Sequence, residues 1–390
     1  MAGVTSAAAQ ERDEPTRFVE VAQVSGWIDP ILADFVIDTV GDAEAAADGP
    51  EVLVLQLDSP GTLVDDDTVD EVVAAVEGAE VPVAVWVGDT GAKALGAAGR
   101  LVEAADVAGM APRARIEVDG RRLGPDEALE AGIVDLNEEE AAVLGTFLAA
   151  LDEEVVDGAA LDTADFEERE DGPPEATLTV QTKLAKLDLW PRLMHSFASP
   201  PVAYLLLAAG LVLLIFELFT GGVGIAGGVG ALCLVLASYG LAVLPTNPVG
   251  LALIVLGVFG FAVDVQTGVP RFWTGVGVLA FAVGSVVLYT DGIRLGWIPL
   301  VAGVVGVLLL VLGGLPATVR SRFSTPTIGR ESMVGEVGEV VTDVRPDGVI
   351  RVRDALWPAH TSRATPVSAG QRVRVVAIEG PRLQVEPADD

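Results

Sequence analysis

The chain has 390 residues, 51% of them hydrophobic, and its mean hydropathy is +0.50. This length exceeds an ordinary single domain, and this hydropathy excludes a purely soluble protein. Residues 1–200 contain 43 acidic and 12 basic side chains, residues 201–325 contain 3 and 4, and residues 326–390 contain 10 and 8. The first half therefore repels nucleic acid and anionic lipid, and its acidity fits either a salty habitat or simple solubility.

Residues 1–16 predict no folded element. Ala7–Ala9, followed by Gln10, looks like the small-residue end of a secretory signal, but no charged or apolar region precedes it. We therefore expect either a disordered alanine-rich start or the remnant of a signal peptide whose true start codon lies upstream.

Residues 17–150 alternate two kinds of apolar pattern, which predicts a parallel α/β sheet. The runs that predict strands are Phe18–Val24, Val52–Leu57, Val81–Val87 and Val107–Ala111. The runs that predict helices are Asp29–Ala47, Asp66–Gly78, Lys93–Ala105 and Pro125–Ala131. Residues 151–200 are predicted to form an acidic linker and an amphipathic segment before a membrane.

A membrane region is predicted over residues 201–316. Its apolar runs are Val202–Phe219, Val223–Leu244, Val249–Val263, Trp273–Tyr289 and Trp297–Leu315. Each run approaches the ~20 residues that a helix needs to cross a bilayer, and none has the polar face of a soluble helix. We expect about five helices, or four if Gly221–Gly230 forms a re-entrant segment.

The charges that flank this region conflict about its orientation. Arg320, Arg322 and Arg330 favour a cytoplasmic C-terminus, whereas Lys183, Lys186 and Arg192 favour a cytoplasmic N-terminus. Five crossings place the two ends on opposite sides of the membrane. Together with the signal-like start, this predicts an extracytoplasmic N-terminal domain and a cytoplasmic C-terminal domain.

Residues 327–388 are predicted to form a small all-β domain. The candidate strands are Gly338–Val344, Val349–Val352, Gln371–Ile378 and Leu383–Val385, with turns such as Arg345–Gly348 between them. Short strands at this spacing fit a small barrel.

Several stretches resemble, in order, the ClpP-class serine protease domain of NfeD proteins. They are Leu55–Gly61, Val81–Val87, Gly91–Ala94, Ala104–Pro112 and Asp126–Asp135. The membrane region and a barrel that ends in Val375–Gly380 and Leu383–Val385 are also similar to that family. The resemblance implies a multi-domain membrane protein with a ClpP/crotonase-like domain, a transmembrane bundle and an OB-fold. It also implies partnership with a stomatin-like (SPFH) membrane protein.

The residues that would carry the family's chemistry are altered. The resemblance places the nucleophilic serine at Gly96, which has no side chain to acylate. The general-base lysine should lie between the strand ending at Pro112 and the Glu-Ala-Leu helix, but Arg113–Gly124 contains no lysine. Arg121 and Arg122 stay protonated and cannot replace it. The backbone turn that stabilises an oxyanion reads Pro60-Gly61-Thr62 instead of Pro-Gly-Gly.

Two enzyme or transport alternatives remain. A rearranged peptidase would recruit Ser59 or Thr90 with Lys93, but a helix cap beside an exposed lysine is the favoured explanation of Thr90 and Lys93. A transporter would use Glu217, or Asp264, which lie in or at the ends of apolar runs; polar contacts within the bundle are the simpler explanation.

The remaining candidate residues predict no cofactor and no metal. Cys233 is a lone thiol in an apolar run, and His195 and His360 have no acidic or cysteine neighbour at ligand spacing. The C-terminal domain has one aromatic ring, Trp357, and a net charge of −2, which disfavours nucleic acid. Four arginines, predicted to share an outward face, would meet acidic residues of a partner protein: Arg351, Arg353, Arg372 and Arg374.

The sequence therefore predicts an NfeD-like pseudoprotease with no catalytic residue, which acts as a scaffold or adaptor for a stomatin-like membrane protein. We also expect it to form homo-oligomers in the lipid bilayer and to bind no nucleic acid.

Overall fold

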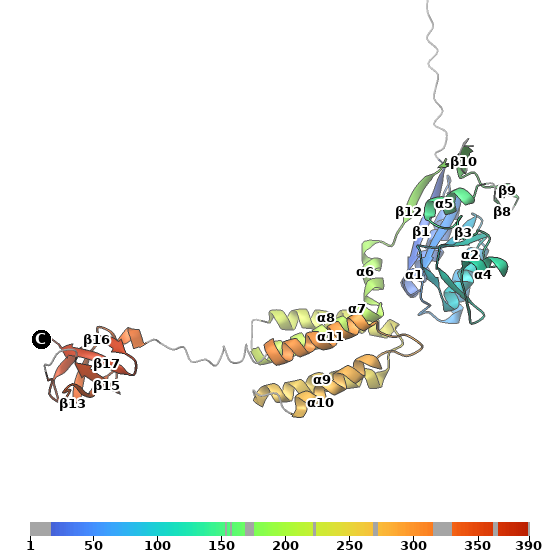
Figure 1. The fold of residues 1–390 in the computed structure, drawn as a ribbon. Coiled ribbons are helices and arrows are strands. Elements are labelled where there is room, and N and C mark those ends of the chain that lie inside the picture. Colours follow the sequence, from blue (N-terminus) through green and yellow to red (C-terminus); the bar gives the residue numbers. More distant parts are fainter. Residues whose placement is uncertain are drawn as a thin grey trace, which may run out of the picture. The chain divides into compact units, whose positions relative to one another are not determined.

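The computed structural model describes residues 17–152, 154–156, 158–167, 175–220, 224–267, 272–314, 330–361 and 366–388. The expectation for residues 1–16 lies outside this part of the chain. The chain divides into two compact units, Met1–Pro316 and Ala317–Asp390, which are described separately. The first unit contains an α/β domain and a block of apolar helices, and the second contains a β-barrel (Figure 1).

The α/β domain is built on a five-stranded sheet with the order β12-β1-β2-β3-β5, in which every neighbouring pair is parallel. The strands are β1 (Phe18–Ser25), β2 (Val52–Asp58), β3 (Val83–Val87), β5 (Val107–Met110) and β12 (Gln181–Ala185). Apolar residues point to both faces of these strands because helices cover both faces. The predicted parallel α/β fold is confirmed.

Alternate residues of each strand enter two separate cores. Leu53, Leu55 and Leu57 pack with α1 (Pro30–Ala45) and α2 (Asp66–Glu77). On the other face, Trp86 stacks on Phe147 of α5 (Leu144–Ala150), and its indole nitrogen donates to the Ala141 carbonyl oxygen at 2.9 Å.

The segment after β3 differs from the predicted helix Lys93–Ala105. Lys93–Ala94 forms a short strand, β4, in a small sheet with β6 (Arg115–Val118) and β7 (Arg121–Leu123). Helical turns begin only at η1 (Gly96–Gly99) and continue in α3 (Arg100–Glu103), before α4 (Pro125–Glu130). The helix starts late because the Lys93 carbonyl oxygen accepts from the Ser59 amide at 2.6 Å, which holds the backbone extended.

The predicted linker in residues 151–200 is in part a component of the domain. It forms β8 (Val155–Val156), β9 (Ala159–Ala160), β10 (Ala164–Glu167), β11 (Glu175–Leu178), β12 and α6 (Leu189–Phe197). Strand β12 pairs with β1 from Phe18↔Gln181 to Ala22↔Ala185, so it is the edge of the main sheet. The sequence did not predict β12 as a strand because charged residues surround it, and an edge strand can be polar on its exposed side.

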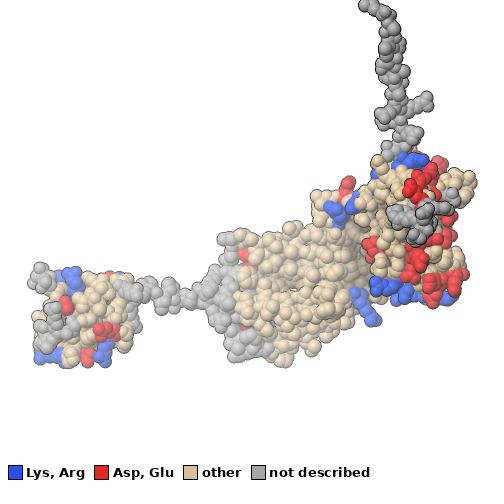
Figure 2. All heavy atoms as spheres, turned by 45° about the horizontal axis from the view of Figure 1, so that its top comes forward, with Lys and Arg blue, Asp and Glu red and all other residues tan. Residues whose placement is uncertain are grey.

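Five apolar helices follow: α7 (Pro200–Thr220), α8 (Ile225–Val243), α9 (Pro248–Thr267), α10 (Phe272–Val286) and α11 (Trp297–Leu309), which continues in a π-helical turn to Gly314. By length and composition, three helices are able to cross a membrane, over Pro200–Phe219, Ile225–Val243 and Trp297–Gly314; α9 and α10 are shorter within the described residues. Almost no charged residue lies over this block in Figure 2. The predicted membrane region is confirmed, and the number of crossings stays a prediction.

Glycines bring these helices into backbone contact. A Cβ on Gly230 of α8 would lie 3.0 Å from the Gly210 carbonyl oxygen of α7, and one on Gly257 of α9 would lie 2.7 Å from the Gly277 carbonyl oxygen of α10. Small residues allow this approach in apolar helix pairs. The helix pairs α7–α8 and α9–α10 in Figure 1 therefore pack through glycine.

The second unit is a closed barrel with the strand order β13-β14-β15-β17-β16, as predicted. The strands are β13 (Val337–Thr342), β14 (Asp347–Val352), β15 (Ala355–Thr361), β16 (Arg372–Glu379) and β17 (Arg382–Pro387). Strand β15 has no counterpart among the predicted strands, because Pro358 weakens its strand pattern. It pairs antiparallel with β14 and parallel with β17, which closes the barrel.

Candidate functional site

Gly96, where the resemblance places the nucleophile, lies on the surface of the α/β domain at the start of η1. Its φ is +59°, and an added Cβ would have no atom within 4 Å. The position therefore has room for a side chain, although a left-handed backbone costs a non-glycine residue about 1 kcal/mol. Glycine itself offers neither a nucleophile nor a proton to transfer.

The connection where the lysine is expected is a β-hairpin. Strands β6 and β7 pair antiparallel, and Arg122 Nε donates to Glu117 Oε2 at 2.9 Å across the hairpin. Arg121 is exposed. Guanidinium groups are donors only, so neither arginine can accept the proton that a nucleophile must lose.

The turn at Pro60-Gly61-Thr62 does not present a free amide for an oxyanion. The Gly61 amide donates to Ser59 Oγ at 3.3 Å, and Ser59 Oγ donates to the Gly61 carbonyl oxygen at 2.8 Å. A Cβ on Gly61 would lie 2.7 Å from the Trp27 ring. An oxyanion hole requires an amide hydrogen aimed at the reacting atom. The Gly61 amide hydrogen is directed at Ser59 Oγ instead.

The alternative nucleophiles have no general base beside them. Ser59 is fully buried and its hydroxyl is held by Gly61, whereas Thr90 lies in an exposed turn. Lys93 has an exposed side chain, and its backbone amide donates to Asp58 Oδ1 at 2.9 Å. In the described part of the chain, no hydrogen bond joins a lysine to either hydroxyl.

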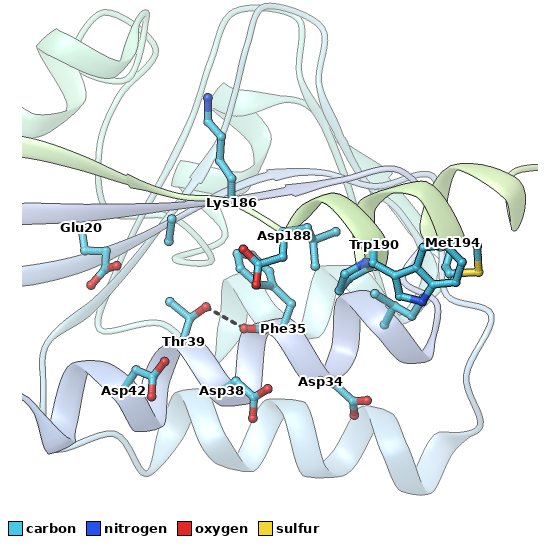
Figure 3. Close-up of a pocket in the computed structure, with 14 residues that line it drawn as sticks. Glu20, Asp34, Phe35, Asp38, Thr39, Asp42, Lys186, Asp188, Trp190 and Met194 are labelled. Carbon is cyan, nitrogen blue, oxygen red and sulfur yellow. Dashed lines mark hydrogen bonds between the residues drawn. The ribbon is translucent and has the colours of Figure 1, made fainter.

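A groove of about 610 Å³ lies between α1 and the segment that joins β12 to α6 (Figure 3). We call it the acidic groove after its carboxylates, which are Glu20, Asp34, Asp38, Asp42 and Asp188. Its apolar part includes Phe35, Trp190 and Met194, and Figure 3 shows Lys186 directed away from the carboxylates of α1. Sequence reasoning missed this groove, although the four-residue spacing of three aspartates on one helix face was visible.

The acidic groove can attract a cation but holds no reactive pair. Among its described lining residues, Thr39 carries the only hydroxyl, and this hydroxyl donates to the Phe35 carbonyl oxygen at 2.6 Å. No histidine or cysteine lines it. The groove is therefore suited to binding and not to covalent chemistry.

A histidine clamp, formed by Asp29, His195 and Ser25, connects α6 to the α/β domain beside this groove. His195 Nδ1 lies 3.0 Å from Asp29 Oδ1, and His195 Nε2 lies 3.1 Å from the Ser25 carbonyl oxygen. The Ser25 carbonyl oxygen can only accept, so Nε2 donates to it, and the carboxylate of Asp29 beside Nδ1 favours the imidazolium form over the neutral ring. The carboxylate of buried Asp29 raises the pKa of His195, against the opposing effect of burial.

Two family comparisons match the second half of the chain. Residues 201–315 match the NfeD integral membrane domain, and residues 330–387 match the NfeD-like C-terminal, partner-binding domain. These two segments are therefore similar to domains of NfeD proteins.

One relative matches most of the chain, and two solved structures match parts of it. The chain is 26% identical over 412 aligned positions to the membrane-bound protease PH1510 of Pyrococcus horikoshii, covering 94% of this chain and 92% of the relative. The 1510-N membrane-bound stomatin-specific protease of P. horikoshii, solved with a substrate peptide, is 17% identical and covers 46% of this chain and 97% of its own, with a TM-score of 0.37. The C-terminal domain of the stomatin operon partner protein 1510-C of P. horikoshii is 36% identical to this chain. The match covers 16% of this chain and 98% of that domain, with a TM-score of 0.16.

In the membrane region, the acidic residues Glu217 and Asp264 bind helix ends. Glu217 Oε1 accepts from the Gly224 amide at 2.9 Å and its Oε2 from the Gly227 amide at 3.3 Å, at the start of α8. Asp264 Oδ2 accepts from the Thr274 amide at 2.7 Å, at the start of α10. These contacts give both carboxylates a role in joining helices, as the simpler explanation predicted.

In the C-terminal barrel, three of the four predicted arginines share an outward face. Arg351, Arg372 and Arg374 alternate with the buried residues Val352, Val373 and Val375. The prediction was wrong for Arg353, which lies in the turn after β14 with a φ of +50°. Its guanidinium binds Glu336, with Nε 2.8 Å from Oε1.

Proposed function

We propose that this NfeD protein is a pseudoprotease that serves as a membrane scaffold or adaptor for a stomatin-like (SPFH) membrane protein. The observation that carries the proposal is Gly96, an exposed glycine in the left-handed region where an active relative requires its nucleophile. Loss of a nucleophile alone removes about 10⁴- to 10⁶-fold of covalent catalysis.

Three further features support the loss of activity. The lysine-bearing segment is replaced by a hairpin with arginines, Ser59 is buried in a local turn, and the Gly61 amide is already paired. Each feature removes a different component, namely the base, the substitute nucleophile and the oxyanion donor. Restoring one of them therefore does not restore the reaction.

The binding role rests on the domains that remain. The barrel matches a partner-binding domain, and the relatives include a stomatin operon partner and a stomatin-specific protease. We propose that this chain inherits the partner class without the cleavage. It forms homo-oligomers within the bilayer, and it uses neither a cofactor nor a metal, and binds no nucleic acid.

The same proposal includes a topology. Three or five crossings both leave the α/β domain and the barrel on opposite sides of the membrane, because both numbers are odd. Arg320 and Arg322, after the last apolar helix, favour a cytoplasmic barrel and an extracytoplasmic α/β domain.

Fluorophosphonate labelling of the purified full-length protein in detergent tests the enzymatic part. We expect no adduct on the wild type and none on Gly96→Ser, because the variant still lacks a base and an oxyanion donor. An adduct on Ser59 or Thr90, abolished by alanine at that position, would revive the rearranged peptidase.

Co-purification with an SPFH protein from the same genome tests the scaffold part. We expect the two proteins to co-elute from detergent-solubilised membranes and the SPFH protein to remain uncleaved. Absence of a complex with any SPFH protein of that genome would sink the scaffold proposal.

A further inference from the structure

The arginines of the barrel divide into two groups by their contacts. Arg345, Arg353 and Arg382 form ion pairs with Asp343, Glu336 and Asp347. The guanidinium groups of the three arginines on strands, Arg351, Arg372 and Arg374, make no ion pair or hydrogen bond with the described residues, and all three side chains are exposed. Asp343, Glu336 and Asp347 therefore pair with Arg345, Arg353 and Arg382, and not with the three arginines on strands.

The strand register collects the unpaired arginines on one surface. Arg351 lies opposite Leu356 of β15 on one side and Glu339 of β13 on the other. Glu339 lies in turn opposite Arg372 of β16. Residues that oppose each other across strands point to the same face of a sheet. Four neighbouring strands therefore present one continuous row.

Val337 and Arg374 extend this row by a second pair of opposed residues. Leu356 is 60% exposed and Val337 is 38% exposed, so apolar groups flank the cations. We define the arginine face as Val337, Glu339, Arg351, Leu356, Arg372 and Arg374. It carries three positive charges and one negative charge.

We propose that the arginine face is the partner-binding surface of the barrel, and that it binds an acidic segment of the partner protein that also carries apolar side chains. This inference rests on the proposed function for the existence of a partner, and it adds where the partner binds and with which chemistry. Guanidinium groups pair carboxylates through two parallel hydrogen bonds, and arginine is enriched at binding hot spots.

Basic residues are scarce in this acidic chain, so a cluster of them on one surface points to the charge of its ligand. Residues 326–390 contain 8 of the 24 basic residues of the whole chain, and all 8 are arginines. The protein carries a net charge of −32, so most of its surface repels an acidic segment. The arginine face is a local exception that fits such a segment by charge complementarity.

Other occupants fit this surface less well. Nucleic acid requires stacking rings, and the one aromatic residue of the barrel, Trp357, is half-buried. The acidic α/β domain of a second copy lies across the membrane under the proposed topology.

The test uses the full-length protein in neutral phosphatidylcholine nanodiscs and a fluorescein-labelled peptide of alternating glutamate and leucine. Binding is measured by fluorescence anisotropy, with a lysine–leucine peptide as the charge-reversed probe. We expect the acidic peptide to bind and the triple variant R351Q/R372Q/R374Q to bind it about 30-fold more weakly.

Two variants separate this surface from a general charge effect. R345Q/R353Q/R382Q removes the same three charges from arginines that are already paired, and we expect a change of less than about 3-fold. E339Q removes the one repulsive charge in the row, and we expect binding to become about 3-fold tighter. Thermal unfolding of each barrel variant shows that the folds are retained.

Equal losses in the two triple variants would overturn the proposal, and so would weaker binding in E339Q or no binding to the unaltered protein. Binding to anionic vesicles or single-stranded RNA that R351Q/R372Q/R374Q abolishes, with peptide binding unchanged, would assign the arginine face to that ligand instead. Co-purification of an SPFH protein equally with R351Q/R372Q/R374Q and wild type would refute the arginine face while leaving the scaffold function intact.

Discussion

The α/β domain and the barrel differ in how they use their polar groups. In the α/β domain, the groups near Gly96 are satisfied locally, since Ser59 binds Gly61 and Arg122 binds Glu117. In the barrel, three arginines on one face remain unpaired although carboxylates are near in sequence. Polar groups that are paired within their own turns offer a ligand little, whereas unpaired charges on a surface remain available to a partner.

The largest effect should come from the core of the α/β domain. Trp86→Ala removes a ring that is 1% exposed and that stacks on Phe147, so it should lower the stability of this domain by about 3–5 kcal/mol. Hydrogen exchange measured by mass spectrometry should show the loss in peptides covering β3 and no change in β16. Equal loss of protection in the barrel would show that the two units unfold together. Val143→Ala, at a position that is 57% exposed, is the control.

A matching change in the barrel should have a smaller, separate effect. Val373 is fully buried, and Val373→Ala should destabilise the barrel by about 2 kcal/mol. The measurement is again hydrogen exchange, now with loss in β16 and none in β3. Protection lost from β3 would contradict the independence of the two regions.

The histidine clamp should make the attachment of α6 depend on pH. Because the pKa of His195 is raised above 6.5, the imidazolium contributes full stability below pH 6.5, and this contribution is lost as pH rises through the folded-state pKa. Exchange in α6 should therefore speed up on going from pH 6 to more alkaline pH, after correction for the intrinsic rate. The clamp should contribute about 2 kcal/mol, as hydrogen bonds to charged groups do.

Asp29→Asn provides a matched variant for the clamp. Asp29 Oδ1 also accepts from the Leu32 amide at 2.9 Å at the start of α1, and asparagine caps helices equally well. The variant should therefore keep α1 and lose most of the pH dependence in α6. A pH profile identical to that of the wild type would exclude the ion pair as its cause.

The smallest effect should come from an arginine that is already paired. Arg353→Gln breaks the contact with Glu336 at the surface, so it should slightly lower the melting temperature of the barrel and leave partner binding unchanged. Arg374→Gln should do the reverse, with unchanged melting and weaker binding in a co-purification assay. Loss of binding in both variants would remove the distinction between paired and unpaired arginines.

The sequence by itself determined the order of the domains and the identity of the residues at the positions where the resemblance expects reactive groups. Apolar runs long enough to cross a bilayer can be recognised from local composition, and alternating strands and helices from local periodicity. Both properties can be read from one sequence. The missing side chain at Gly96 and the missing lysine between Arg113 and Gly124 are likewise facts of composition.

The tertiary structure alone decided which distant residues meet. It placed β12 beside β1, across more than 150 residues of chain, and it gave His195 a carboxylate partner in Asp29, although the two are 166 positions apart in the sequence. It also separated Arg353 from Arg351, Arg372 and Arg374, since a left-handed turn redirected one side chain and the strand register aligned the other three. Pairings of this kind depend on long-range register, and the local pattern of a sequence carries almost no information about register.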